Sequence, residues 1–503
     1  MLHARIRTRL WWNQLGKDNT LKKMRTLGLA LLAILAWGTA APAQTWTPLT
    51  HQPSFQASTS LLLTDGSVMV HVYGARQWWK LTPDNTGSYV NGTWSQLASL
   101  ASNYAPLYYA SAVLPDGRVI VEGGEYNFLQ GVWTTLGAIY DPQTNVWTPV
   151  SPPSGWGTIG DAQSVVLPNG TFMMANCCTT QQALFDASTL TWTSTGTGKA
   201  DINDEEGWTL MPNGLVLTVD ANNVTDLTHS ERYSPKLGKW ASAGSTVVKL
   251  PDTNSNGSGS HELGPAVLRP DGTVFATGAT GHTAIYTPAA SGPGSWVAGP
   301  DFPGGNDIGD GPASLLPSGN VLCATSPGIF QPPVHFYEFD GTNLTSVPAT
   351  PNSPGDTSFQ GRMLLLPTGQ VLYTDGTSDV EIYTAGGTSN PAWAPRVKTV
   401  PSTLTRGSTY VVSGAQFNGL SQGAAYGDDA QSATNYPLVR ITNQSTGHVF
   451  YARTHDHSTM AVATGKAHVS TNFDVPATME TGTASLSVVA NGLASNPVTV
   501  TIQ

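Results

Sequence analysis

Acidic side chains recur at corresponding positions of a repeated pattern in this chain. They stand shortly before the turn dipeptides that separate apolar runs, and they are Asp161, Glu205, Glu206, Glu262 and Asp310. Carboxylates that converge raise one another's pKa, bind cations or accept hydrogen bonds from sugar hydroxyls. Glu205, Glu206 and Glu262 are therefore candidate catalytic residues, in which one carboxyl serves as acid and another as base.

Further polar and aromatic residues belong to the same loops. The residues that we expect to bind a ligand there are Arg76, Tyr108, Tyr109, Asp161, His261, His282, Asp310 and Gln360. Aromatic rings stack on sugar faces, while carboxylates accept hydroxyl hydrogens. The alternative is that these loops only face solvent and cap the strand ends with hydrogen bonds.

A histidine-rich run lies near the C-terminus. His455 and His457 have the i, i+2 spacing that points two side chains to one face of a strand, a geometry that can seat a transition metal. His455 and His457 are therefore candidate metal ligands. The alternative is a polar surface strand with no bound ion.

The elements that must position these residues repeat along the chain. Seven turn dipeptides follow one another at steps of 44 to 58 residues, close to the period of about 50 of kelch repeats: Asp65-Gly66, Asp116-Gly117, Asn169-Gly170, Asn213-Gly214, Asp271-Gly272, Ser318-Gly319 and Thr368-Gly369. Most copies then carry an aromatic third strand, such as that of Tyr140, and a fourth strand with a Trp, such as Trp147. This pattern predicts an all-β protein with a seven-bladed kelch-type β-propeller. Thr45 to Leu49 resembles a Trp strand and is expected to complete the last blade.

The chain divides into three predicted parts. Residues 1–43 have a basic start, an apolar run and a small-residue cleavage pattern, which indicate a signal peptide, with Met24 as the expected initiator. An uncleaved N-terminal anchor is the alternative. Residues 44–396 hold the repeats, and residues 397–503 alternate as a single immunoglobulin-like (E-set) β-sandwich.

Net charge and hydropathy limit the kinds of partner that we expect for this chain. The formal net charge of −10 disfavours nucleic acid, and no segment of the mature chain is long and apolar enough to be an integral membrane span. We expect a monomer that is secreted, periplasmic or at the cell surface. The chain has three cysteines, so no disulfide framework holds it, and adjacent Cys177 and Cys178 form either a vicinal disulfide or a thiol pair.

This organisation resembles the galactose oxidase and glyoxal oxidase superfamily. The similarity rests on the repeats, on the strand Leu438-Val439-Arg440 and on Thr454-His455. It implies that His455 is the metal ligand that reaches the propeller channel, where the family binds copper, and His448 is the rival candidate for this position. Where those oxidases carry a copper-binding Tyr-His pair, this chain has Phe359 and Gln360. A phenyl ring and an amide replace neither ligand, so copper is not expected, while another divalent cation remains a possible cofactor.

Several functions follow as hypotheses. The first is a secreted propeller that binds a carbohydrate or another polar ligand at an acidic channel mouth, without copper-radical chemistry. The second is an extracellular enzyme, either a carboxylate-based glycan hydrolase or lyase, or a copper oxidase with a remodelled site that uses His455, His261 or His282. The third is a protein-interaction platform, because a propeller fold alone does not fix a function.

Overall fold

A computed structural model describes residues 44–427, 429 and 432–503, so the predicted signal peptide lies outside the described residues. The described part is almost entirely β-structure, apart from the short 3-10 helices η1 (Pro303–Gly305), η2 (Ser358–Gln360) and η3 (Pro391–Trp393). The predicted all-β fold is confirmed. Within the described residues, no helix is long and apolar enough to cross a membrane.

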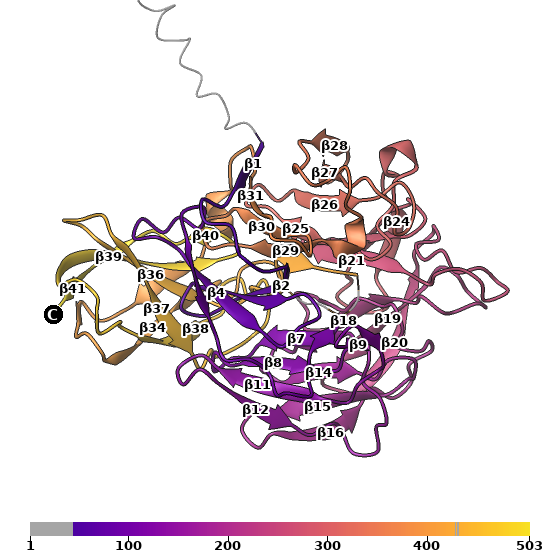
Figure 1. Cartoon of the computed structure of the whole chain (residues 1–503), viewed down its shortest axis with the longest axis horizontal. Coiled ribbons are helices and arrows are strands. Elements are labelled where there is room, and N and C mark those ends of the chain that lie inside the picture. The colour runs from indigo at the N-terminus through magenta and orange to yellow at the C-terminus, as the bar shows by residue number, and fades with distance from the viewer. Residues whose placement is uncertain (1–43, 428, 430–431) are drawn as a thin grey trace, which may run out of the picture. The chain divides into compact units, whose positions relative to one another are not determined.

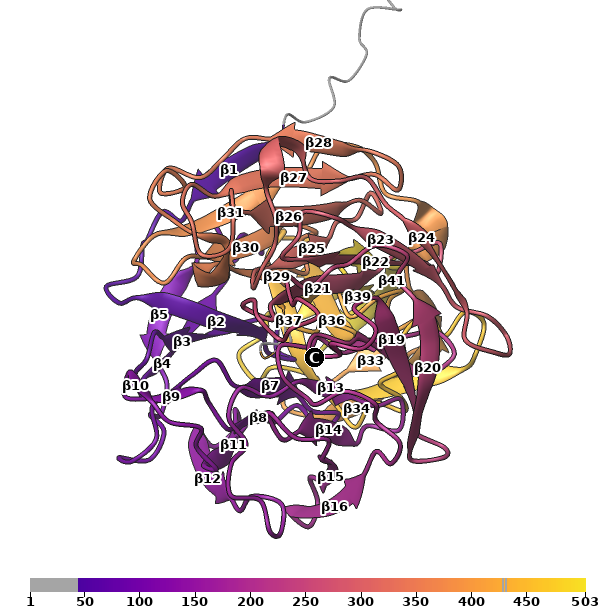
Figure 2. The same ribbon diagram turned by 90° about the vertical axis from the view of Figure 1, so that its right-hand side faces the viewer.

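Each predicted copy corresponds to one antiparallel sheet, and Figure 2 shows these sheets around a common centre. The first two contain β2 (Ala57–Leu62), β3 (Val68–Val72), β4 (Trp78–Thr82) and β5 (Thr93–Gln96), then β7 (Ala110–Val113), β8 (Val119–Glu122), β11 (Gly137–Asp141) and β12 (Val146–Val150). The third and fourth contain β13 (Ser164–Val166), β14 (Phe172–Ala175), β15 (Gln182–Asp186) and β16 (Thr191–Thr195), then β17 (Thr209–Leu210), β18 (Val216–Val219), β19 (His229–Ser234) and β20 (Lys239–Ser245). In each sheet the first strand lies innermost, where it contacts the first strand of a neighbouring sheet.

The remaining sheets continue this order. The fifth and sixth contain β21 (Leu263–Leu268), β22 (Val274–Gly278), β23 (Ala284–Thr287) and β24 (Ser295–Ala298), then β25 (Ala313–Leu315), β26 (Val321–Thr325), β27 (His335–Phe339) and β28 (Leu344–Val347). The seventh contains β29 (Arg362–Leu365), β30 (Val371–Thr374), β31 (Val380–Thr384) and β1 (Thr45–Pro48). A small extra sheet of β6 (Pro106–Leu107), β9 (Tyr126–Asn127) and β10 (Gln130–Gly131) lies in the loops of the second.

The repeated Trp residues join neighbouring sheets. In the second sheet Tyr140 pairs across the strands with Trp147, and the Trp147 indole N–H donates a 2.9 Å hydrogen bond to the Ala98 carbonyl, just after the first sheet. Trp46 and Trp192 make the same kind of bond to Pro348 and Ser151. Each Trp therefore packs within its own sheet and ties that sheet to the one before it.

The two ends of the repeat region meet in one sheet. β1 pairs antiparallel with β31, with Trp46 opposite Tyr383, so the predicted closure by Thr45 to Leu49 is confirmed. Trp393, the last Trp of this region, lies in η3 and not in this sheet. In the sixth sheet the residue that corresponds to Tyr140 is Phe339, which lies opposite Leu344. The N-terminal strand thus removes an open sheet edge that could pair with other chains.

The C-terminal strands form a separate hydrogen-bonded group (Figure 1, yellow). They are β32 (Arg396–Thr399), β33 (Thr403–Leu404), β34 (Thr409–Ala415), β36 (Leu438–Asn443), β37 (Val449–His455), β38 (Val469–Asp474), β39 (Gly482–Ala490), β40 (Leu493–Ala494) and β41 (Val498–Ile502). Their own apolar core includes Val412, Ile441, Phe473 and Leu486. The segment 416–436 leaves this group, because its strand β35 (Ala424–Ala425) pairs with β25 of the sixth sheet.

Candidate functional site

The loops that lead into the innermost strands share an unusual backbone. Just before or at the start of their strands, Tyr108, Glu205, His261 and Asp310 have positive φ angles of 52°, 57°, 71° and 47°. Such a conformation costs a residue with a side chain about 1–3 kcal/mol and persists only where its surroundings enforce it. Backbone strain at equivalent positions of several sheets therefore marks the loops that lead into the innermost strands as a candidate site.

Three carboxylates from neighbouring sheets meet at this end. Glu205, Glu262 and Asp310 precede the first strands of the fourth, fifth and sixth sheets, and one oxygen of each lies within 4.8 Å of the others. Burial and the nearby Asp429 carboxylate raise the pKa of Asp310 to about 7, against a hydrogen bond with Glu262 that lowers it. Carboxylate oxygens at this spacing could hold a hard divalent cation or share a proton.

One buried cation faces these acids. The Arg362 side chain comes from β29 of the seventh sheet, and its guanidinium carbon lies 3.6 Å from the centre of the Tyr426 ring and 5.4 Å from that of Tyr108. The guanidinium also donates 2.8 Å hydrogen bonds to the carbonyls of Phe359 and Gly361. Arg362 is only 2% exposed, so its charge is held in place by aromatic faces and backbone oxygens rather than by water.

The C-terminal segment 416–436 supplies the other side of the site. The Asp429 carboxylate accepts a 2.7 Å hydrogen bond from the Tyr109 backbone N–H, and the Tyr426 hydroxyl donates to the Phe359 carbonyl at 2.8 Å. Earlier in the same segment, the Gln422 amide oxygen accepts a hydrogen bond from the Leu210 backbone N–H of β17. The described residues of this segment therefore contact innermost strands or their entry loops in several sheets, and the Asp429 carboxylate lies near that of Asp310.

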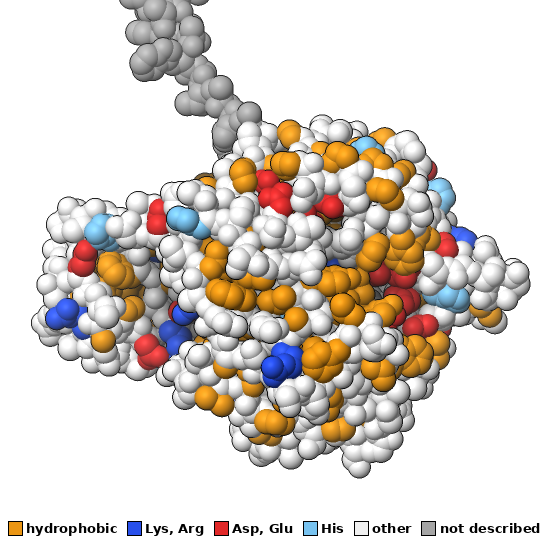
Figure 3. Space-filling view, in the orientation of Figure 1, with side chains coloured by type: hydrophobic (Ala, Val, Ile, Leu, Met, Phe, Trp, Pro, Cys, Tyr) orange, Lys and Arg blue, Asp and Glu red, His pale blue; other side chains and the backbone are white. Residues whose placement is uncertain are grey.

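We define the channel-mouth site as Tyr108, Glu205, Glu262, Asp310, Arg362, Tyr426 and Asp429. Glu125 lies near the same charges. Its pKa is raised to about 7, first by burial and then by the nearby Asp429 carboxylate. Figure 3 shows carboxylates gathered at the right-hand side of the molecule, away from the C-terminal strands. Of the site residues, Arg362, Tyr426 and Asp429 are not predicted from the sequence. Neither repeat position nor spacing links Tyr426 and Asp429 to the loops, and Arg362 begins the strand β29 instead of lying in the loop before it.

Glu206 does not join this site, although it follows Glu205 directly. Its buried carboxylate accepts a 2.9 Å hydrogen bond from the Lys199 ammonium and one of 3.1 Å from the Thr218 hydroxyl. The Lys199 ammonium also pairs with Glu231 at 2.7 Å, and Asp201 and Asp220 lie nearby. Glu205 and Glu206 are therefore not a catalytic pair, because the left-handed backbone at Glu205 sends the two side chains to different surroundings.

His455 lies on the C-terminal strands and away from the channel mouth. Its Nδ1 is 2.7 Å from the Asp456 carboxylate and its Nε2 is 3.2 Å from that of Asp474, at a surface cavity of about 400 Å³ also lined by Asp116 and Arg453. His448 is paired with Glu480 at 2.6 Å on the same domain. His457 is buried, with its Nδ1 2.8 Å from the Thr471 hydroxyl. Segment 416–436 takes the central place that the resemblance assigned to His455.

The other predicted residues divide between rim and structural roles. The His261 ring lies 3.3 Å from the Thr253 hydroxyl, whereas His282 is exposed and pairs with Asp301 at 2.8 Å. Gln360 caps η2 by accepting hydrogen bonds from Thr357. The Arg76 guanidinium donates to the Leu100 carbonyl. Asp161 is partly buried in the third sheet's loop, and Tyr109 is fully buried beside His71.

Cys177 and Cys178 form a vicinal disulfide, which answers the alternative that the sequence left open. The Asp204 carboxylate lies 3.2 Å from the Cys178 sulfur and 3.6 Å from that of Cys177. Asp204 also precedes Glu205 in the chain. The Cys178 backbone N–H donates a 2.6 Å hydrogen bond to the Asn203 carbonyl, so the cysteine pair is tied to the loop that carries Glu205.

A copper centre of the kind found in galactose oxidase does not fit these residues. Phe359 packs its ring against Phe330, Gln360 is used as a helix cap, and His455 is paired on another surface. What meets at the channel mouth is carboxylate and phenol oxygen beside a guanidinium, whereas copper(II) favours imidazole nitrogen. No step through copper is therefore derived for this chain.

Comparison with known proteins places the fold. No protein-family model matches the chain, and no curated protein matches its sequence. A fungal alcohol oxidase of the AA5 family, solved in complex with copper, superposes with a TM-score of 0.53 at 14% identity, over 92% of this chain and 100% of that chain. A streptogramin B lyase superposes with a TM-score of 0.47 at 11% identity, over 69% of this chain and 99% of that chain. Virginiamycin B lyase from Staphylococcus aureus, solved with quinupristin, superposes with a TM-score of 0.48 at 9% identity, over 68% of this chain and 99% of that chain. The chain thus has a fold similar to β-propeller and galactose-oxidase structures.

Proposed function

We propose that the channel-mouth site binds a hydroxyl-rich ligand such as a carbohydrate, without copper-radical chemistry. The observation that carries this proposal is the meeting of Glu205, Glu262 and Asp310 within 4.8 Å, together with the nearby Arg362 and the two aromatic rings that lie against its guanidinium. Carboxylates accept hydrogen bonds from sugar hydroxyls, a guanidinium donates to sugar oxygens, and phenol rings offer a stacking surface.

The finer assignments belong to this proposal. We assign residues 44–396 to a seven-bladed kelch-type propeller and residues 397–503 to an immunoglobulin-like E-set sandwich of the galactose-oxidase-like superfamily. We further assign residues 1–43 to a signal peptide that directs a monomer to the periplasm or the outside of the cell. The propeller assignment is supported by the strand pairing and the fold likeness to the AA5 oxidase.

A binding measurement tests the proposal. Wild-type protein is screened on a glycan array, and hits are measured by calorimetry against Glu205→Gln, Asp310→Asn and, as a matched surface control, Glu480→Gln. Loss of a carboxylate should weaken binding about 10-fold or more, since a hydrogen bond to a charged group contributes about 1.5–3 kcal/mol. An array with no hits, or equal affinity in all variants, would falsify the proposal.

A second candidate is an acid–base enzyme acting on glycans. It is favoured by the hydrogen bond between Asp310 and Glu262 together with the Asp310 pKa of about 7, which keeps one proton available near neutral pH. Retaining glycosidases hold their two carboxyl groups about 5–5.5 Å apart and inverting ones about 6.5–9.5 Å apart. The oxygens of Glu205, Glu262 and Asp310 lie within 4.8 Å of one another, nearer the retaining separation, so a hydrolase using two of them should retain configuration. NMR of the released sugar anomer distinguishes retention from inversion, and the absence of turnover of any array ligand removes this candidate.

A further inference from the structure

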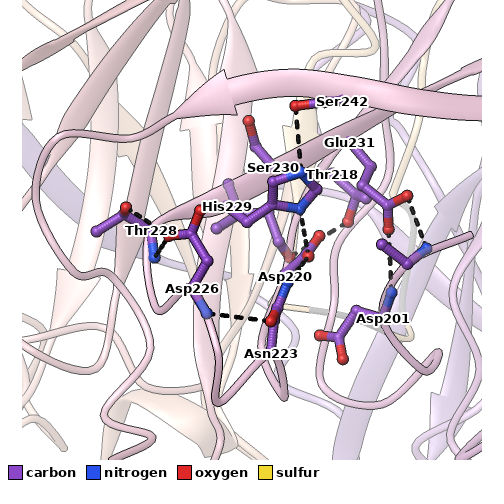
Figure 4. A network of polar contacts seen from close by, with 12 residues as sticks. Asp201, Thr218, Asp220, Asn223, Asp226, Thr228, His229, Ser230, Glu231 and Ser242 are labelled. Atoms are coloured by element: carbon purple, nitrogen blue, oxygen red, sulfur yellow. Dashed lines mark hydrogen bonds and ion pairs between the residues drawn. The ribbon is translucent and has the colours of Figure 1, made fainter. Parts of the chain in front are cut away.

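A separate chain of polar contacts lies on the fourth sheet (Figure 4). The Asp220 carboxylate is 2.6 Å from Nδ1 of His229, and Nε2 of His229 is 3.1 Å from the Ser242 hydroxyl. The Asp220 side chain is fully buried, the His229 side chain is 20% exposed, and Ser242 is exposed. This is the order of contacts and burial of a Ser-His-Asp nucleophilic site, which is recognised by geometry rather than by sequence position.

The strands explain why these three side chains meet. Asp220 directly follows β18, His229 begins β19 and Ser242 lies in β20, and these are neighbouring strands. The register shifts between Ser230 and Glu231, so Glu231 pairs with Ser242 while His229 pairs with Ser245. Since paired residues share a face, the bulge brings Ser242 to the face of His229, whereas an unbroken register would place it on the other face.

The hydrogen bonds also indicate which nitrogen of the neutral His229 ring carries its hydrogen. A carboxylate only accepts, so Nδ1 of His229 carries the hydrogen that bonds to Asp220, and Nε2 of the neutral ring is left as an acceptor. The Gly244 backbone N–H donates to the Ser242 oxygen at 3.1 Å, so the Ser242 hydroxyl hydrogen is free to be donated to Nε2. The Asp220 hydrogen bond also raises the pKa of His229. Once the ring has lost its second proton, it is in the tautomer that can remove the Ser242 proton.

Asp220 is held in its place by further contacts. The Asn223 side-chain amide donates to the same carboxylate oxygen at 2.9 Å. Burial alone would raise the pKa of Asp220, but the His229 hydrogen bond and the Lys199 charge outweigh it and lower this pKa. Asp220 therefore stays ionised and acts as a positioning residue for the imidazole.

We propose that Ser242 is a nucleophile that accepts acyl groups from small esters, a function independent of the channel-mouth site. The Ser242 oxygen forms a bond to the ester carbonyl carbon as His229 takes its proton, and the ester C–O bond breaks with release of the alcohol, which takes that proton. Water then attacks the acyl carbon as His229 takes one of the water protons, the bond between the acyl carbon and the Ser242 oxygen breaks, and His229 passes that proton to the Ser242 oxygen as the carboxylic acid leaves. The sum is ester plus water giving acid plus alcohol.

A fluorophosphonate probe and p-nitrophenyl acetate test this site in the full-length mature protein. The Ser242 oxygen should displace fluoride from the probe, and peptide mass spectrometry should find the adduct on Ser242. Ser245 is the matched control, because it is exposed on the same strand but donates to the Thr228 hydroxyl instead of a histidine. Ser245→Ala should label like wild type, whereas Ser242→Ala should not label at this peptide.

Variants of His229 and Asp220 provide the remaining measurements. His229→Gln should slow both labelling and ester hydrolysis about 100-fold or more, because it removes the general base. Asp220→Asn should shift or remove the downfield imidazole N–H resonance of His229, a change that thermal unfolding run in parallel would not report. Absence of an adduct on Ser242, an equal adduct on Ser245, or labelling that is unchanged in His229→Gln overturns the proposal.

Discussion

The Tyr109 backbone N–H and the Asp429 carboxylate form a 2.7 Å hydrogen bond across 320 residues of sequence. Tyr109 lies in the loop that enters the second sheet, and Asp429 lies in the segment that leaves the C-terminal strands. The bond therefore ties Asp429 to the loop that enters the second sheet. It also sets the charge there, because the Asp429 carboxylate raises the pKa values of Asp310 and Glu125.

Asp429→Ala should loosen this connection. It leaves the buried Tyr109 N–H without its acceptor, which costs about 1–3 kcal/mol of unfolding free energy. It should also lower the pKa values of Asp310 and Glu125, since a neighbouring negative charge is removed. Urea unfolding measures the first effect and carboxyl NMR titration the second. Asp429→Asn is the control, because it keeps an acceptor oxygen but has no charge. Its stability should be close to that of wild type, whereas the pKa values of Asp310 and Glu125 should stay lowered, as in Asp429→Ala.

Lys199→Met should strongly destabilise the fourth sheet. The Lys199 ammonium pairs with Glu206 and Glu231, and all three side chains are at most 2% exposed. Removing one partner of a buried ion pair leaves uncompensated charge and costs about 3–5 kcal/mol. Lys236→Met, at an exposed lysine, should change stability by less than about 0.5 kcal/mol. Equal unfolding midpoints for both variants would contradict the buried network.

Asp310→Asn should change how stability depends on pH. Burial raises the pKa of Asp310 from 3.8 to about 7 in the folded protein, so the folded state holds a proton that the unfolded state releases. This group's contribution is therefore present below about pH 4 and is lost as pH rises to about 7. The variant lacks that loss, so its stability relative to wild type should rise between pH 4 and 7. Paired thermal melts across this range measure the difference, and a constant difference would refute the assignment.

Gly137→Ala should destabilise the second sheet. An added Cβ would lie 2.0 Å from the Glu122 carboxylate, on a neighbouring strand in the core. Overpacking of this kind costs about 1–3 kcal/mol. Gly131→Ala is the control, because its Cβ would meet nothing nearer than 3.8 Å. Adding Glu122→Ala to Gly137→Ala should restore part of the loss, and failure to do so would show that the clash is not with Glu122.

Local sequence determined the sheets and the loops that hold the acids. The turn at Asp116-Gly117 needs a glycine, whose φ is 86°, and the pairing of Tyr140 with Trp147 follows from strand alternation. Such features depend on residues close in sequence, so their spacing is sufficient to predict them. The placement of Glu262 and Asp310 at the mouth follows from the same repeat, because equivalent loops lie at the same end of neighbouring sheets.

Only the tertiary structure decided which side chains meet. The positive φ at Glu205 separates it from Glu206, and the bulge after Ser230 brings Ser242 to His229. Asp429 reaches the mouth through a contact 320 residues away in the sequence and Tyr426 through one 67 residues away. These two residues occupy the place that the resemblance gave to His455. Repeat spacing carries no information about such long-range contacts, because they depend on how separate sheets pack and on which side chains the remaining space admits.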